Sequence, residues 1–290
     1  MGKAVFLLRR LVFIKNMKET LKAAHQWMEA YMKSFYCEDK DIMFGIQMKE
    51  KHTGYVTTNA RQLALHLQLS SHDVDLAELI GLLHDVGRFR QWQLYKTFVD
   101  AKSEDHADLG VKVIQELPFY DLLGQEEKDL VLFAIKNHNK KEIAPAPDKR
   151  HLLFAKIIRD ADKLDIFRVL APYLTANPDA EGQSAAIRKF MKGPNGDATG
   201  EMGVFAPGFL EKFVRGEQVD YTMIRTNEDR KLVRLMWVYD VNYAWTLQRI
   251  RDKGYIEAII ANLPDSEMLR QGVERLQKYV SAKCASPDIA

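Results

Sequence analysis

Cysteine is almost absent from the sequence. Only Cys37 and Cys284 occur among 290 residues, and most of the chain separates them. This spacing fits neither a disulfide-stapled secreted domain nor a cysteine-based metal site. We therefore expect two reduced thiols and a cytoplasmic protein.

An excess of charge of one sign is also missing. The 42 lysines and arginines nearly balance the 40 aspartates and glutamates, so the net charge is +2. No face with clustered basic and interleaved aromatic residues is evident. We therefore expect neither nucleic acid nor an anionic membrane as a partner.

Apolar runs long enough to cross a membrane are missing as well. Residues 1–15 are apolar with a basic interruption, and Arg9-Arg10 resembles part of a twin-arginine export signal. Lysine and glutamate residues follow in place of an apolar segment, so we do not expect export. Met17 is an alternative first residue, and a surface anchor is the less favoured interpretation.

Alternating apolar and polar residues, which are typical of strands, do not stand out, whereas apolar residues recur at three- and four-residue steps. The pattern predicts an all-α protein. We expect helices over 16–36, 40–69, 74–86, 106–117, 125–138, 148–174 and 266–282, with further helices between 207 and 263.

Several segments interrupt the helical pattern. We expect loops at 91–104 and 144–147, and a long loop at 176–207 that is rich in Gly, Pro, Asn and Asp. Such a long loop fits a lid over a site or, equally, an insertion without order. The tail 286–290 is expected to be disordered. The chain then divides into an N-terminal extension and helix at 1–40, a core at 41–174, and a loop and C-terminal helical region at 175–290.

The most informative stretch is GLLHDVGR, residues 81–88. It puts an imidazole, His84, beside a carboxylate, Asp85, after a strongly apolar run. Neighbouring residues can share a target at a helix end, and Gly87 provides a stop signal. Two ligand-type residues at the buried end of an apolar helix suggest a metal site. A His-Asp dipeptide is common by chance, so partners elsewhere must support this interpretation.

Three further histidines in predicted helices are candidate ligands. His52 by itself fits a structural or exposed residue better than a ligand. His106 opens a helix, where the dipole disfavours a charged ring and suits a neutral, metal-bound one, although a surface histidine also explains it. His138 closes a helix, where the dipole favours a charged ring, so a capping role competes with a metal role.

Three carboxylates, Asp160, Asp162 and Asp165, lie in the middle of an otherwise apolar predicted helix. Buried carboxylates are costly unless they pair with cations or bind metal. Asp162 follows Ala155 and Ile158 at helical steps, so it continues the apolar face. We expect Asp162 to point inward.

The stretches LLHDVGR and RDADKLD, with His52 before them, resemble the HD-domain superfamily of metal-dependent phosphohydrolases. The matched contexts cover about half of the chain, residues 41–174. The resemblance implies an HD-domain helical bundle with an additional C-terminal helical region. It also implies a first metal ion, held by His52, His84, Asp85 and Asp162.

His106 and His138 match the two intervening histidines of the dinuclear branch of that superfamily. The resemblance therefore implies a second ion, with Asp85 as the bridge. The mixture of nitrogen and oxygen ligands suits Mn, Fe, Co, Ni or Zn better than Ca. We expect one or two divalent transition-metal ions.

The activity that the resemblance implies is hydrolysis of a phosphate ester, a nucleotide or another small phosphorylated metabolite, by a metal-activated water. The expected catalytic residues are Asp85, Arg88 and Lys163. The expected phosphate-binding cations are Arg88, Arg159, Lys163 and Lys140. A solvated turn is the better explanation of Lys140, and Lys163 has an alternative role as an ion-pair partner of Asp160 or Asp165.

Two other functions fit the same residues. The ligand set of four histidines and two aspartates also resembles the HD-type di-iron oxygenases, which use O2. A non-catalytic nucleotide sensor would keep the metal for structure and use the C-terminal helices for homo-oligomer formation. Asn139-Lys140-Lys141 follows His138 where cyclic-dinucleotide phosphodiesterases have Gly-Tyr-Pro, so we do not expect that substrate.

Overall fold

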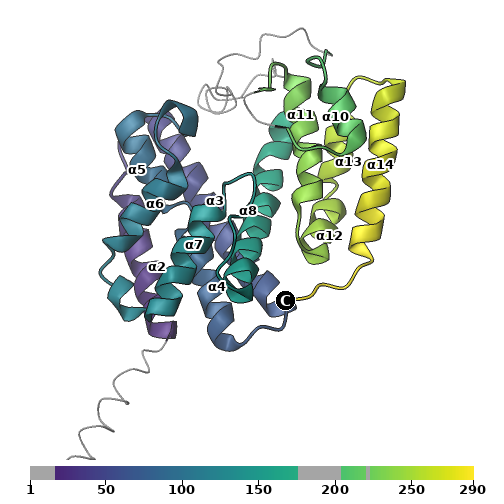
Figure 1. The fold of residues 1–290 in the computed structure, drawn as a ribbon. Helices are drawn as coiled ribbons and strands as arrows, with labels where there is room; N and C mark the ends of the chain where they lie inside the picture. Colours follow the sequence, from purple (N-terminus) through teal and green to yellow (C-terminus); the bar gives the residue numbers. More distant parts are fainter. Residues whose placement is uncertain (1–16, 176–203, 220–222) are drawn as a thin grey trace, which may run out of the picture.

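The computed structural model describes residues 17–175, 204–219 and 223–290, and these residues form helices without strands (Figure 1). The predicted all-α class is confirmed. None of the described helices has the length and apolar composition of a membrane span. The helices are α2 (Met17–Lys33), α3 (Lys40–His66), α4 (Ser71–Leu83), α5 (Val86–Tyr95), α6 (His106–Gln115), α7 (Gln125–Asn137), α8 (Lys149–Thr175), α10 (Phe209–Arg215), α11 (Asn227–Met236), α12 (Ala244–Asp252), α13 (Tyr255–Ile260) and α14 (Glu267–Cys284), with 3-10 turns at Asp100–Lys102, Tyr120–Leu122 and Trp237–Asp240.

Residues 1–15 and most of the predicted 176–207 loop lie outside the described residues, so the expectations of a surface anchor and of a lid are untouched by the structure.

Helices α3, α4 and α8 pack against one another at the centre of the N-terminal part. The closest approach is at Gly81 of α4, where a Cβ atom would lie 2.9 Å from Thr57 Cα and 3.1 Å from Ala60 Cβ of α3. Only a glycine lets the two helices approach this closely. The crossing brings His84, at the end of α4, against His52 in the middle of α3.

The predicted loop at 91–104 is wrong in its first part, because α5 continues to Tyr95. Gly87 is a helical residue of α5 and not a stop. A Cβ atom there would overlap His106 O and lie 2.5 Å from Gly110 N, so the packing of α5 on α6 requires the glycine. The helix ends instead at Lys96, whose φ of 53° is left-handed.

Helices α10 to α14 form a second group, which lies on the other side of α8 from α5, α6 and α7 (Figure 1). Helices α11, α12 and α13 pack on α8. The fully buried Asp160 of α8 accepts hydrogen bonds from Asn242 N, Asn242 Nδ2 and Tyr243 N, each 2.9 Å long. One carboxylate thus fixes the segment that enters α12.

The predicted disorder of the tail 286–290 is wrong, because Asp288 is held by the fold. Its carboxylate accepts hydrogen bonds from Ala244 N at 2.6 Å and Trp245 N at 2.9 Å, the first two residues of α12. It also lies 3.2 Å from His66 Nε2 at the end of α3. The free N–H groups of a helix start favour such a carboxylate.

We expect Asp160→Ala to lower the free energy of unfolding by about 2–4 kcal/mol, because buried main-chain N–H groups of Asn242 and Tyr243 would lose their acceptor. The measurement is urea unfolding followed by circular dichroism. The control is Asp121→Ala, whose side chain is 93% exposed and lies 2.9 Å from Lys128 Nζ. That change should cost less than about 1 kcal/mol, and equal losses in the two variants would contradict the role of Asp160.

Candidate metal centre

The six residues that the sequence implies as ligands come together in the interior. His52 lies in α3, His84 and Asp85 form the junction between α4 and α5, His106 begins α6, His138 follows α7, and Asp162 lies in α8. The four histidines and Asp85 are buried, and the side chain of Asp162 is 14% exposed.

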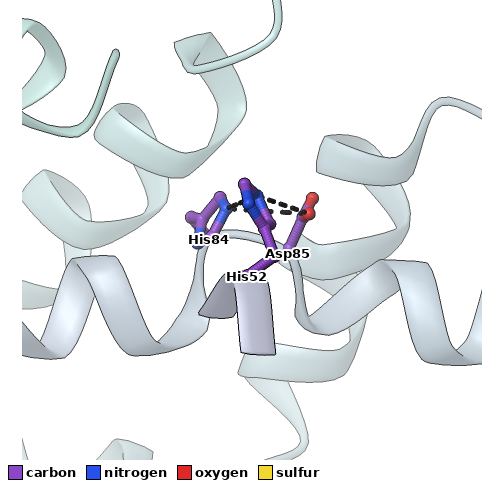
Figure 2. A group of neighbouring side chains, drawn as sticks. All are labelled: His52, His84 and Asp85. Atoms are coloured by element: carbon purple, nitrogen blue, oxygen red, sulfur yellow. Dashed lines mark hydrogen bonds and ion pairs between the residues drawn. The ribbon is translucent and has the colours of Figure 1, made fainter. Parts of the chain in front are cut away.

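The Asp85 carboxylate lies between two pairs of histidines. Its Oδ2 is 3.4 Å from His52 Nε2 and 3.6 Å from His84 Nε2 (Figure 2). Its Oδ1 is 3.5 Å from His106 Nε2 and 3.8 Å from His138 Nε2. Each oxygen faces its own pair, so this carboxylate could bridge two ions. We call the pair His52 and His84 the first half-site, and the pair His106 and His138 the second half-site.

Asp162 adds a second carboxylate to the first half-site. Its Oδ1 lies 3.1 Å from His52 Nε2 and 3.9 Å from His84 Nε2. The first half-site therefore offers two nitrogens and two carboxylates, Asp85 included. The second half-site offers two nitrogens and the other oxygen of Asp85. Both sets consist of the ligand types that divalent transition metals prefer.

The outer nitrogen of each histidine is anchored to an oxygen. His84 Nδ1 donates to Gly81 O at 2.8 Å, and His138 Nδ1 donates to Ile135 O at 2.6 Å. In both cases the acceptor is the carbonyl three residues earlier in the same helix. The remaining two rings use carboxylates: His52 Nδ1 lies 2.6 Å from Asp165 Oδ2, and His106 Nδ1 lies 2.7 Å from Asp100 Oδ2. With Nδ1 as donor, Nε2 faces the centre and can bind a metal.

The spacing of the inner nitrogens fits one ion per half-site. His52 Nε2 and His84 Nε2 are 3.3 Å apart, and His106 Nε2 and His138 Nε2 are 3.0 Å apart. Two nitrogens that each lie about 2.1 Å from one ion are separated by roughly 3.0–3.4 Å at right-angled or tetrahedral geometry. Wherever both rings of a pair are neutral with Nδ1 as the donor, their Nε2 lone pairs face each other, and a shared cation relieves this repulsion. The residues present therefore fit a metal in both half-sites.

Burial keeps two of the rings neutral. It lowers the pKa of His84 to about 3. Burial, with the nearby charge of Arg88, lowers the pKa of His106 to about 4. Neutral imidazole is the form that binds metal ions.

The carboxylates of the centre stay ionised although they are buried. Burial acts to raise the pKa of Asp85, but the charge of Lys49 opposes it and the pKa lies well below its usual value. Burial also acts to raise the pKa of Asp162, but the hydrogen bond with His52 outweighs burial, so the pKa is lowered.

His52 differs from the other two. Burial and the charge of Lys49 act to lower its pKa, but Asp162 and Asp165 outweigh them, so the pKa is raised above 6.5. The raised pKa favours a proton on His52, where it interacts with the carboxylates, and a metal ion that binds His52 must displace this proton.

An arginine supports the carboxylate behind one histidine of each half-site. Arg168 binds Asp165 through Nε at 2.6 Å and Nη2 at 3.2 Å, a two-point contact that turns Asp165 toward His52. In the second half-site Arg88 Nη1 lies 2.9 Å from Asp100 Oδ1, beside the contact of Asp100 with His106.

The predicted phosphate-binding cations are placed differently from one another. Arg88 lies at the centre: its Nε is 3.5 Å from Asp85 Oδ1 and makes no hydrogen bond with a described residue. Lys140 Nζ lies on the rim and binds Asp105 Oδ2 at 2.6 Å.

Arg159 and Lys163 face the C-terminal group of helices. Arg159 donates to the carbonyls of Asn137, Lys140 and Lys141, and its Nη2 binds Asp240 Oδ2 at 2.7 Å. Lys163 Nζ binds the same oxygen at 2.8 Å, and burial lowers its pKa. Their catalytic or substrate-binding role stays a prediction, and these contacts support a structural role in docking α8 on the 3-10 turn Trp237–Asp240. The partner of Lys163 is not Asp160 or Asp165, as the alternative interpretation assumed, but Asp240.

Two residues of the centre were missed by the sequence analysis. Lys49 Nζ lies 2.7 Å from Asp85 Oδ2 and is buried. A signal existed, because Lys49 precedes His52 by three residues and so shares its helix face. Asp100 gave no signal, because it lies in an irregular segment after α5 and only the tertiary structure brings it to His106.

Residues 50–166 match the family model of the HD domain. The match includes all six residues of the centre. This part of the chain is an HD domain. Searches of curated proteins and of solved structures find no match. HD domains are typical of metal-dependent phosphohydrolases, and the His/Asp groups of this HD domain could hold a metal ion.

We expect Asp165→Asn and Asp100→Asn to weaken metal binding by about 10- to 100-fold, because an amide orients the ring less strongly than a carboxylate does. The measurement is metal affinity by isothermal titration calorimetry. The matched control is Asp148→Asn, which changes an aspartate 2.9 Å from His151 Nδ1, a histidine outside the centre. Unchanged affinity in the first two variants would contradict the orienting role.

The pKa shifts predict proton release on metal binding. The raised pKa of His52 favours its charged ring, whereas His84 and His106, with pKa values of about 3 and 4, are neutral near neutral pH. A metal ion entering the first half-site should release a proton, and this release should decline as the pH rises above the pKa of His52. Calorimetry in buffers of different ionisation enthalpy measures the release. It should decrease in His52→Ala, and an unchanged release in that variant would contradict the assignment.

Proposed function

We propose that this HD domain is a metal-dependent phosphohydrolase that acts on the phosphate ester of a small metabolite, with a nucleotide as the first candidate. The observation that carries the proposal is the Asp85 carboxylate between two pairs of inward-facing imidazoles. This arrangement supports two ions at neighbouring places, which is the arrangement that phosphoryl-transfer chemistry uses most. The small substrate, the cytoplasmic location and homo-oligomer formation remain expectations from the sequence.

When bound, divalent ions here would lower the pKa of a coordinated water and polarise a phosphoryl oxygen. The chain's own residues provide the framework. The four anchored Nδ1 atoms hold the rings in one orientation, so the donors need little reorganisation. Asp85 and Asp162, both ionised, balance cationic charge.

The charges around Asp85 also support an anionic substrate. Lys49 lies on the Oδ2 side at 2.7 Å and Arg88 on the Oδ1 side at 3.5 Å. An ester oxyanion that approaches the centre would meet a positive charge on each side. This is a reason to prefer a phosphate ester over a neutral substrate.

We expect Asp85→Ala to reduce phosphate release from ester substrates to the rate of the metal-free protein while the helical content is retained. The reason is that one change removes a ligand from both half-sites. The assay is phosphate release from a panel of nucleotides and sugar phosphates after reloading with Mn, Fe, Co, Ni or Zn, with elemental analysis of each sample.

Asp148→Ala, which removes an exposed aspartate, is the control and should keep both metal and activity. Full activity in Asp85→Ala would overturn the mechanism. An iron-loaded protein that consumes O2 and releases no phosphate would instead favour the oxygenase alternative, because the same donor set can hold two irons.

A further inference from the structure

The side chains around the centre differ in their exposure to solvent. The histidine side chains are at most 5% exposed and that of Asp85 is 3% exposed. Those of Lys49, Asp162 and Arg88 are 11%, 14% and 15% exposed. Asp100, which contacts His106, is 32% exposed. Lys49 and Arg88 are therefore the two cations beside Asp85 that are partly open to solvent.

Lys49 has donors to spare. An ammonium group has three N–H bonds, and Lys49 Nζ makes one hydrogen bond with the described residues, to Asp85 Oδ2 at 2.7 Å. The Phe98 ring, with its centroid 5.9 Å from Nζ, gives no conventional hydrogen-bond acceptor. A lysine with two free N–H bonds is costly to bury unless a ligand or water uses them.

The Arg88 guanidinium is held in place by more contacts than the Lys49 ammonium group. Its Nη1 already donates to Gln91 Oε1, Phe98 O and Asp100 Oδ1, at 2.7–2.9 Å. These contacts fix the guanidinium as part of the support for Asp100. Arg88 Nε makes no hydrogen bond with a described residue, but the Nη1 contacts fix the guanidinium in place. Lys49 Nζ is held by one hydrogen bond, so it can turn its other N–H bonds toward an incoming oxyanion.

The charges of the centre favour a highly charged anion. Four carboxylates and three cations line it: Asp85, Asp100, Asp162 and Asp165, with Lys49, Arg88 and Arg168. These groups sum to a single negative charge, so two divalent ions would leave a net charge of +3. A phosphomonoester dianion offsets more of this charge than a phosphodiester monoanion does.

We propose that Lys49 binds a non-bridging phosphate oxygen of the substrate and that it makes the centre select phosphomonoesters over phosphodiesters. This assignment rests on the proposed phosphohydrolase function and adds a binding residue and a substrate class to it. Lys49 keeps Asp85 as one partner and gives its other N–H bonds to the phosphate.

The test compares Lys49→Met with Lys51→Met. Lys51 lies on the same helix and is exposed, so it controls for the loss of a lysine from α3. Inorganic phosphate is the probe for binding by calorimetry to the metal-loaded proteins. p-Nitrophenyl phosphate and its bis ester are the probes for turnover.

In Lys49→Met we expect the Kd for inorganic phosphate and the KM for the monoester to rise by about 10- to 100-fold, the usual loss for a hydrogen bond to a charged group. The kcat should change less, and the preference for monoester over diester should decrease. Lys49→Arg should keep most of the phosphate affinity, and Lys51→Met should match the unchanged protein.

Unchanged phosphate affinity and ester preference in Lys49→Met, with metal content retained, would overturn the proposal. So would loss of the metal from Lys49→Met, because the lysine would then serve only to hold Asp85. If the unchanged protein hydrolyses neither ester but binds phosphate through Lys49, the phosphohydrolase function fails while the anion site stands.

Discussion

The centre depends on one buried carboxylate that is approached from both sides. Each oxygen of Asp85 faces a different pair of imidazoles, and a cation stands beside each oxygen. A buried anion is stable only when such partners surround it. The helix ends that meet here therefore surround Asp85 with charged and polar partners as well as pack against one another. The helices approach closely enough for this at Gly81 and Gly87.

The two half-sites share a plan. In each, one histidine at a helix end is anchored to the carbonyl three residues before it, and the other is anchored to a carboxylate that an arginine supports. The arginine contacts orient the two carboxylates toward the rings. The half-sites differ in Asp162, which adds charge to the first half-site and raises the pKa of His52, whereas His106 remains neutral.

Helix α8 serves the centre and the C-terminal helices with different faces. Asp162 and Asp165, three residues apart, point to His52. Asp160 and Lys163 point to the segment between α11 and α12, where they bind Asn242 and Asp240. The charged residues of this segment are adjacent in the sequence but have two roles: one pair contacts the centre and the other pair contacts the C-terminal helices. The C-terminal group of helices is coupled to the centre through this helix.

The sequence by itself determined the helical class and most helix positions, and its resemblance to the HD-domain superfamily implied the six residues of the centre. Apolar residues at helical steps show which face of a helix is buried. A motif of adjacent residues such as His84-Asp85 is recognisable because its members are close in the sequence. The tertiary structure decided the rest: that Gly87 serves packing and does not end a helix, that Asp100 and Asp165 orient rings, and that Asp240 takes the charges of Arg159 and Lys163. These roles depend on contacts between segments far apart in the chain, and residue type and local spacing carry no record of which distant partner a side chain meets.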